Sequence, residues 1–207
     1  MISTFKARRG IAPNLPVAGA GQRIGLLGGS FNPAHGGHVQ ISAIAKARLG
    51  LDQVWWLVSP RNPLKSADDL TDLAERVAGA RALAHSSFIR VTSLEAAIGV
   101  RYSIETIRYL QIHYGTVRFV WIVGADNLVI FHRWKCWREI AASMPIAVVD
   151  RPGAGLAATA SRFATVFKRN RFDEADSGAL TLAKPPAWLI IHGPLSPLSS
   201  TAIRRGV

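Results

Sequence analysis

Two glycines and two histidines stand close together near the start of the chain, in the stretch GGSFNPAHGGH. Gly28 and Gly29 lack Cβ atoms, so their main-chain N–H groups can approach a phosphate closely. A helix that begins near Gly37 would present its positive N-terminal end to the same place. His35 and His38, one turn apart at the entrance of that helix, could donate hydrogen bonds to a phosphate and to a developing negative charge. The stretch therefore predicts an anion-binding loop.

The spacing of this loop differs from the common phosphate-binding fingerprints. It is neither the GxGxxG of dinucleotide folds nor the GxxxxGK[ST] of P-loops, and it contains no lysine. Two exposed loop histidines would be the alternative interpretation of the pair alone. The whole stretch, however, resembles the GG[ST]F[DN]PxHxGH signature of the nucleotidyltransferase superfamily, whose HxGH histidines contact the phosphates of ATP. The resemblance implies catalytic roles for both histidines and ATP contacts from Gly28, Gly29, Ser30 and Phe31.

A second motif, LSSTAIR, spans residues 198–204. Hydroxyl residues at the start of a helix offer N–H and O–H donors to phosphate, and an arginine one turn later adds a charge-assisted contact. Alone, the motif would be an ordinary helix N-cap. It resembles the ISSTxIR motif of the same superfamily, with Leu198 in place of isoleucine. This implies ATP contacts from Ser199, Ser200 and Thr201 and a catalytic role for Arg204.

The segments between these motifs resemble those of bacterial nicotinate-nucleotide adenylyltransferases. IVGADN at 122–127 is similar to the family's IxGxDN, which lines the adenosine pocket; Gly124 would leave room for the nucleotide and Asp126 would accept from ribose hydroxyls. FHRWKCWREI at 131–140 is similar to FxxWxxWxxI, whose first tryptophan, here Trp134, stacks on the pyridine ring. An unassigned tryptophan is more often core, and Trp137 keeps that interpretation. We place Lys135 with the same acceptor.

Three shorter segments complete the resemblance. RYSIET at 101–106 matches the family's YT/YS segment, which implies that Ser103 marks the place where backbone groups hold the nicotinate carboxylate. Arg151 lies in a turn similar to the family's RPG and is a candidate for the acceptor's phosphate, with a solvated turn arginine as the alternative. SPRNPLK at 59–65 stands where relatives have PPHK, so Leu64 replaces a histidine, while Lys65 can meet the triphosphate as a point charge.

The elements that must position these residues follow from apolar periodicity. Short, continuous apolar runs suit strands buried on both faces, and stretches of helical period lie between them, with Thr71 and Ser103 as candidate N-caps and Gly115 as a helix stop. This alternation predicts a Rossmann-like, doubly wound, mostly parallel α/β sheet with helices on both faces, in which ligands bind beyond the carboxyl ends of the strands. The predicted strands are Ile24–Leu27, Val54–Val58, Phe88–Thr92, Val117–Val123, Ile146–Val149 and Trp188–Ile191.

Length and composition bound the remaining possibilities. The 207 residues, 49% hydrophobic, suit one globular domain, which we place at 23–207 after a flexible basic arm at 1–22. Residues 151–186 show no clear period and predict an irregular connection that contains one short helix. No apolar run approaches the roughly 20 residues of a membrane span. The single cysteine, Cys136, cannot form an internal disulfide, which is compatible with a cytoplasmic location.

Together, the motifs predict adenylyl transfer from ATP to nicotinate mononucleotide, with Mg²⁺ arriving with ATP and no dedicated metal site. Phosphopantetheine or nicotinamide mononucleotide as acceptor are the nearest alternatives; the tryptophan segment disfavours the first, and the second differs by one small group. A net charge of +12 attracts polyanions in general and raises the alternative of a nucleic-acid-binding module. That alternative leaves both motifs unexplained, so we expect no specific nucleic-acid or membrane partner, and a homo-oligomer stays open.

Overall fold

The computed structural model describes residues 16–61, 70–193, 198 and 200–205, and its centre is a parallel sheet. Six strands pair in the order β3-β2-β1-β4-β5-β6, and every pairing is parallel. All six predicted strands are confirmed, with boundaries shifted by two residues at most. The strands are β1 (Arg23–Gly29), β2 (Gln53–Val58), β3 (Ile89–Thr92), β4 (Arg118–Gly124), β5 (Ile146–Val149) and β6 (Trp188–Ile191).

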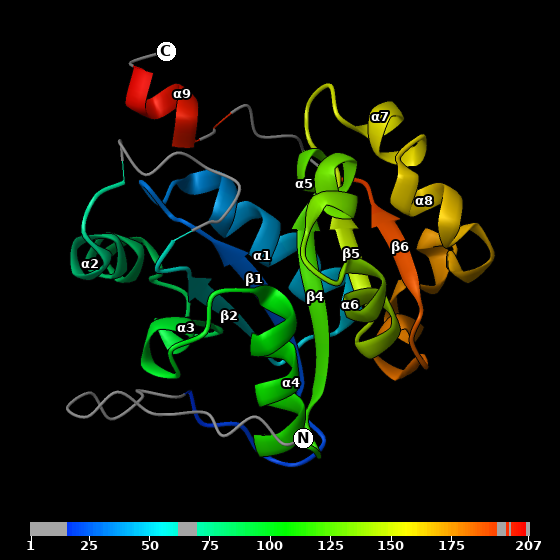
Figure 1. The fold of residues 1–207 in the computed structure, drawn as a ribbon, viewed down its shortest axis with the longest axis horizontal. Coiled ribbons are helices and arrows are strands. Elements are labelled where there is room, and N and C mark those ends of the chain that lie inside the picture. The colour runs from blue at the N-terminus through cyan, green and yellow to red at the C-terminus, as the bar shows by residue number, and fades with distance from the viewer. Residues whose placement is uncertain (1–15, 62–69, 194–197, 199, 206–207) are drawn as a thin grey trace.

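Helices connect the strands and cover both faces of this sheet (Figure 1). The α-helices are α1 (Gly36–Leu49), α2 (Leu73–Leu83), α3 (Leu94–Ala97), α4 (Ser103–His113), α5 (Ala125–Ile130), α6 (Trp137–Ser143), α7 (Gly155–Thr159), α8 (Arg162–Val166) and α9 (Ser200–Arg205). Short 3-10 segments are η1 (Phe131–Arg133), η2 (Lys168–Asn170) and η3 (Glu174–Leu182).

The apolar core has two layers, one on each face of the sheet. Successive strand residues point to opposite faces, so Trp55 belongs to the core layer that contains residues of α3 to α8, while its neighbour Trp56 belongs to the layer with α1, α2 and η3. Both indoles are fully buried. This two-sided burial explains why the strands are continuous apolar runs without alternation. The predicted doubly wound fold with helices on both faces is confirmed.

The strand order places a crevice above the middle of the sheet. From β1 the chain moves outward through β2 to β3, then returns to β4 on the other side of β1 and continues to β5 and β6. Leu27 of β1 pairs with Ile122 of β4, so the loops after these two strands diverge from adjacent carboxyl ends. Such a switch point is where open parallel sheets bind ligands.

Several local predictions were wrong. Asp72, not Thr71, caps α2, because its carboxylate accepts from the N–H of Ala74 at 2.8 Å. The cap of α4 is Tyr102, so Ser103 becomes the first helical residue. The predicted stop at Gly115 is confirmed, because α4 ends at His113 with Tyr114 as its C-cap, directly before Gly115.

The connection at 151–186 is also more regular than expected, since it contains α7, α8, η2 and η3. These pieces are too short for a helical period to show in the sequence.

The end of the predicted N-terminal arm touches the domain. Tyr114 donates its hydroxyl to the carbonyl of Pro16 at 3.2 Å, and Gly21 N–H donates to Thr116 at 2.9 Å. Residues 1–15, which carry the basic side chains of the arm, lie outside the described residues. The division into arm and domain stays a prediction.

Throughout the part of the chain that the structure describes, no helix combines the length and the apolar character needed to cross a membrane.

Candidate active site

A cavity of about 580 Å³ opens at the carboxyl ends of β1 and β4. Most of the residues predicted for the site line it: Gly28, Gly29, Ser30, Phe31, His35, His38, Ser103, Gly124, Asp126, Trp134, Lys135, Arg151, Ser200 and Thr201. Arg204 does not line the cavity but reaches the loop that does. Lys65 and Ser199 lie outside the described residues. The fold thus brings together side chains from both ends and the middle of the chain.

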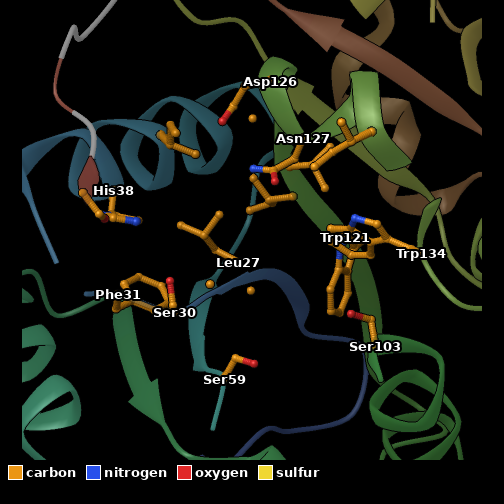
Figure 2. Close-up of a pocket in the computed structure, with 18 of the residues that line it drawn as sticks. Leu27, Ser30, Phe31, His38, Ser59, Ser103, Trp121, Asp126, Asn127 and Trp134 are labelled. Atoms are coloured by element: carbon orange, nitrogen blue, oxygen red, sulfur yellow. The ribbon is translucent and has the colours of Figure 1, made fainter. Parts of the chain in front are cut away.

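The cavity has two sides, which Figure 2 shows facing each other. From the motif predictions we call them the nucleotide side and the acceptor side. The predicted nucleotide side consists of the segment from Gly28 to His38, Gly124 at the end of β4, Asp126 of α5, and α9, with Arg151 beside Asp126. The acceptor side consists of the following lining residues from α3, the start of α4, β4 and the η1–α6 segment: Glu95, Tyr102, Ser103, Trp121, Trp134 and Lys135.

The end of β1 is too tightly packed for larger residues at its last two positions, Gly28 and Gly29. A Cβ on Gly28 would lie 3.3 Å from the Trp121 ring, and one on Gly29 would lie 3.3 Å from the Phe31 ring. Phe31 itself adopts the left-handed region, at φ 47°, a conformation that non-glycine residues hold only when packing fixes it. Its ring stacks on Trp56 at 5.1 Å. The glycines therefore bring the backbone against both the sheet and the cavity.

The two histidines are held against each other at the start of α1. The main-chain N–H of His35 donates to Nδ1 of His38 at 3.2 Å, and the two rings lie 4.0 Å apart. Because Nδ1 of His38 accepts, the proton of the neutral ring must sit on Nε2. His38 packs on Phe31 at 4.6 Å and lines the cavity, as Figure 2 shows. The backbone thus sets the tautomer that makes Nε2 a donor.

Burial keeps His35 neutral. Its side chain is buried, and this burial, together with a smaller effect of the nearby Arg151 charge, lowers its pKa to about 4. Within the described residues, its Nδ1 has no hydrogen-bond partner. Gly37 makes room for this ring, because a Cβ there would lie 2.9 Å from Nδ1. The glycine between the motif's histidines is thus a packing requirement.

Helix α9 is fastened to the loop after β1 by side-chain hydrogen bonds. The hydroxyl of Ser200 donates to the Pro33 carbonyl at 2.9 Å, and Nη1 of Arg204 donates to the Asn32 carbonyl. Arg151, from the loop after β5, donates from Nη2 to the carbonyl of Leu198, two residues before α9, at 2.7 Å. The two sequence motifs therefore form one structure.

At the end of β4, Asp126 and Arg151 form an ion pair of 3.4 Å between Oδ2 and Nη1. Gly124 lies beneath them. A Cβ on this glycine would stand 2.4 Å from Oδ1 of Asp126 and 3.1 Å from Cδ of Arg151. The glycine predicted to make room for a nucleotide thus also makes room for this pair.

Trp134 belongs both to the core and to the cavity wall. Its ring stacks on buried Phe131 at 4.8 Å and meets Trp121 edge-on at 6.4 Å, while the residue also lines the cavity. Trp137 is buried in the core, as predicted. Lys135 places its ammonium 4.1 Å from the Tyr102 ring, which ties the η1–α6 segment to the start of α4.

Several lining residues were not predicted for the site from the sequence, including Ser59, Glu95, Trp121 and Arg133. Trp121 stood inside an apolar strand, yet its buried Nε1 has no hydrogen-bond partner in the described part of the chain. Glu95 is buried and accepts from Thr106 Oγ1 at 3.1 Å. No local motif surrounds either residue, because packing between distant elements brings them to the cavity.

Comparison with known proteins first defines the class. The model of the cytidylyltransferase-like family matches residues 26–206. Within that class, proteins named probable nicotinate-nucleotide adenylyltransferase are similar along nearly their whole length. The protein from Agrobacterium fabrum is 51% identical over 87% of this chain and 97% of its own. The one from Methylorubrum extorquens is 53% identical over 88% and 98%. The chain therefore belongs to the nicotinate-nucleotide adenylyltransferase family, and the family predicted from the motifs is confirmed.

Solved structures support the fold. The Plasmodium falciparum nicotinic acid mononucleotide adenylyltransferase complexed with NaAD superposes with a TM-score of 0.66 at 17% identity, covering 89% of this chain and 83% of that one. A Vibrio parahaemolyticus structure described as a putative nicotinate-nucleotide adenylyltransferase gives 0.52 at 20% identity, covering 64% and 76%. At such low identity the likeness concerns the fold alone.

Proposed function

We propose that this chain transfers the adenylyl group of ATP to nicotinate mononucleotide, giving deamido-NAD and pyrophosphate, a step of NAD biosynthesis. The observation that carries the proposal is the cavity itself, which places the phosphate-type motifs from both ends of the chain opposite an aromatic acceptor side. Relatives about half identical over nearly their full length bear the same activity in their names.

The reaction needs positioning more than acid–base chemistry. An oxygen of the acceptor's phosphate attacks the α-phosphorus of ATP in line; that P–O bond forms as the bond to the pyrophosphate oxygen breaks. A phosphate monoester with a second pKa near 6 is already largely dianionic at neutral pH, so the nucleophile requires no general base. The site must instead hold two anions together and stabilise the charge that moves to pyrophosphate.

On the nucleotide side, His38 is assigned to the moving charge. Its tautomer makes Nε2 the donor, and α1, at 14 residues, adds the positive end of its dipole. His35, neutral and with an unpartnered Nδ1 among the described residues, supplies a second ring for the phosphates. Ser200, Thr201 and Arg204 approach from α9, and Gly124 and Asp126 from the adenosine end. The proposed contacts of Lys65 and Ser199 stay predictions.

On the acceptor side, Trp134 offers an aromatic face to the electron-poor pyridine ring. Ser103 lines the cavity and is the first residue of α4, a helix of 11 residues, whose first N–H groups have no partner within the helix. Lys135 and Arg151 are assigned to the acceptor's negative charges. These residues supply hydrogen-bond donors and positive charge for both a carboxylate and a phosphate. Nicotinate mononucleotide carries both groups, whereas phosphopantetheine carries a phosphate but no carboxylate.

Mg²⁺ is proposed to arrive with ATP. Within residues 16–61, 70–193, 198 and 200–205, no three His, Cys, Asp or Glu side chains gather to hold a metal ion. The phosphate oxygens and waters would therefore hold Mg²⁺, as is common for this ion, and its charge would neutralise the triphosphate. A cytoplasmic location, a homo-oligomer and the lack of a specific nucleic-acid partner remain predictions.

Pyrophosphate release from ATP and Mg²⁺ tests the proposal, with nicotinate mononucleotide, nicotinamide mononucleotide and phosphopantetheine offered separately. We expect the highest kcat/KM with the nicotinate form. Preference for phosphopantetheine would contradict the roles of Trp134 and Ser103 while leaving the nucleotide side intact. Failure with all three acceptors would contradict the transfer activity itself.

A further inference from the structure

Glu95 is a buried carboxyl group in the cavity wall that the transfer chemistry above does not use. It is the second residue of α3, its exposure is 6%, and it lines the acceptor side. In the described part of the chain, no lysine, arginine or histidine forms an ion pair with it. A carboxylate buried without a cation is costly, so its surroundings favour the protonated form.

The hydrogen bonds of Glu95 fix where this carboxyl lies. Thr106 Oγ1 donates to Glu95 Oε1 at 3.1 Å, and the hydroxyl of Ser59, after β2, also bonds to it. Ser103 and Thr106 are three residues apart on α4 and therefore share a face, with Cβ atoms about 5 to 6 Å apart. Ser59 and Ser103 both line the cavity, in the lower part of Figure 2. Thr106, the hydrogen-bond partner of Glu95, thus lies about one helical turn from Ser103, the place assigned to the pyridine carboxylate.

Among the described residues, no positively charged group opposes the effect of burial on the Glu95 pKa. Burial raises its pKa to about 7, the hydroxyls of Ser59 and Thr106 oppose that rise, and Glu105 on α4 adds to it. The strand beneath α3, β2, presents apolar Trp55 and Leu57 to this face of the sheet. Arg101, Tyr102, Arg133 and Lys135 line the same cavity from the start of α4 and from the η1–α6 segment.

We infer that Glu95 couples acceptor choice to a proton: the nicotinate acceptor binds while Glu95 is protonated, and ionised Glu95 rejects the acid but not the amide. The physical reason is that two carboxylates close together in a poorly solvated site cannot both stay ionised at low cost. The amide acceptor carries no charge on its ring substituent, so its binding is indifferent to this proton. The inference rests on the proposed function and assigns Glu95 a positioning and selectivity role without contact with the reacting phosphates.

The ratio of kcat/KM for nicotinate mononucleotide to that for nicotinamide mononucleotide, followed against pH, tests this role. Taking the ratio cancels the titration of ATP, the acceptor phosphate and the histidines, which both reactions share. We expect the ratio to fall as pH rises through 7, by at most about tenfold per pH unit, the limit for one coupled proton. Glu95→Gln keeps an acceptor for the hydroxyls and should make the ratio independent of pH.

Glu139→Gln is the matched control, because Glu139 is an exposed carboxylate paired with Arg108 and does not line the cavity. It should keep the wild-type slope. An equal slope in wild type and Glu95→Gln, or no slope in wild type, would overturn the inference. Turnover with neither acceptor would instead contradict the proposed function, so the two failures are distinguishable.

Proton uptake by the unaltered protein gives a second test that needs no variant. Calorimetric titration with each acceptor, beside a non-transferable ATP analogue, is run in buffers of different ionisation enthalpy. Slightly above pH 7, binding of nicotinate mononucleotide should take up more protons than binding of the amide. Equal uptake for the two acceptors would overturn the role of Glu95.

Discussion

Hydrogen bonds between segments from the two ends of the chain hold the nucleotide side of the cavity together, whereas packed aromatic rings form most of the acceptor side. Ser200 and Arg204 of α9 bond to carbonyl groups of the loop after β1. The indole ring of Trp134, by contrast, is held by aromatic contacts with Phe131 and Trp121. The nucleotide side is therefore specified by particular polar atoms, and the acceptor side by shape and by one buried acid.

Each side also contains one buried titratable group whose pKa is shifted, and the two shifts have opposite directions. Burial lowers the pKa of His35 on the nucleotide side and raises that of Glu95 on the acceptor side, because each is driven toward its neutral form. A neutral histidine can still donate to an incoming phosphate, and a neutral carboxyl group accommodates an incoming carboxylate. His35 and Glu95 therefore both favour their uncharged forms when the anionic substrates bind.

The largest expected effect comes from removing the donor on the nucleotide side. His38→Ala should lower kcat by about 10² to 10³-fold, the usual cost of losing one donor to a developing charge. Steady-state kinetics measure this, and circular dichroism checks the fold. His85→Ala, an exposed histidine outside the cavity lining, should leave kcat unchanged. Near-normal turnover in His38→Ala would remove its assigned role.

A smaller but still large loss should follow from crowding His35. Gly37→Ala places a Cβ 2.9 Å from Nδ1 of His35, which must shift; a displacement of this kind can cost up to about 10²-fold in kcat. Gly79→Ala in α2 is the matched control, since its Cβ would meet nothing within 4 Å. That control should keep wild-type kinetics and gain about 0.5 to 1 kcal/mol in free energy of unfolding. Unchanged kcat in Gly37→Ala would show that the loop tolerates movement of His35.

Trp134→Ala tests the acceptor side and should raise the KM of the acceptor about tenfold through lost stacking, with the KM of ATP little changed. The nearby Trp137→Ala should instead affect stability, lowering the free energy of unfolding by about 3 to 5 kcal/mol because Trp137 is a core residue. Initial-rate kinetics and denaturant unfolding measure the two effects. An equal rise in the KM of ATP and of the acceptor in Trp134→Ala would contradict the stacking role and indicate that Trp134 is only a core residue.

The smallest effects concern how the free energy of unfolding depends on pH. The buried groups His35 and Glu95 should change it in opposite directions. The folded pKa of His35, about 4, lies below its ordinary 6.5, so its contribution is present above pH 6.5 and is lost as pH falls toward 4. The folded pKa of Glu95, about 7, lies above its ordinary 4.5, so its contribution is present below pH 4.5 and is lost as pH rises through 7.

Melting temperatures across this range check that prediction. Relative to wild type, His35→Gln should gain stability as pH falls, and Glu95→Gln should gain it as pH rises. Parallel curves for wild type and either variant would contradict the corresponding pKa shift.

The site residues that could be predicted from the sequence are those that lie in contiguous motifs. Gly28 to His38 and the hydroxyl residues before Arg204 each form a local pattern, and the six apolar runs place them at one edge of the sheet. Glu95 has no such pattern, because its partners Ser59 and Thr106 come from the loop after β2 and from α4 and meet it only after folding. The helices between 151 and 186 were missed for a related reason: α7 and α8 have five residues each, too few to show a period.

The most direct test of the division into two sides is an experimental structure of this chain with deamido-NAD bound. We predict the pyridine ring against Trp134 with its carboxylate at the start of α4, the adenosine near Gly124 and Asp126, and the phosphates between His35 and His38. A dinucleotide with its two ends exchanged, or bound away from this cavity, would contradict the account.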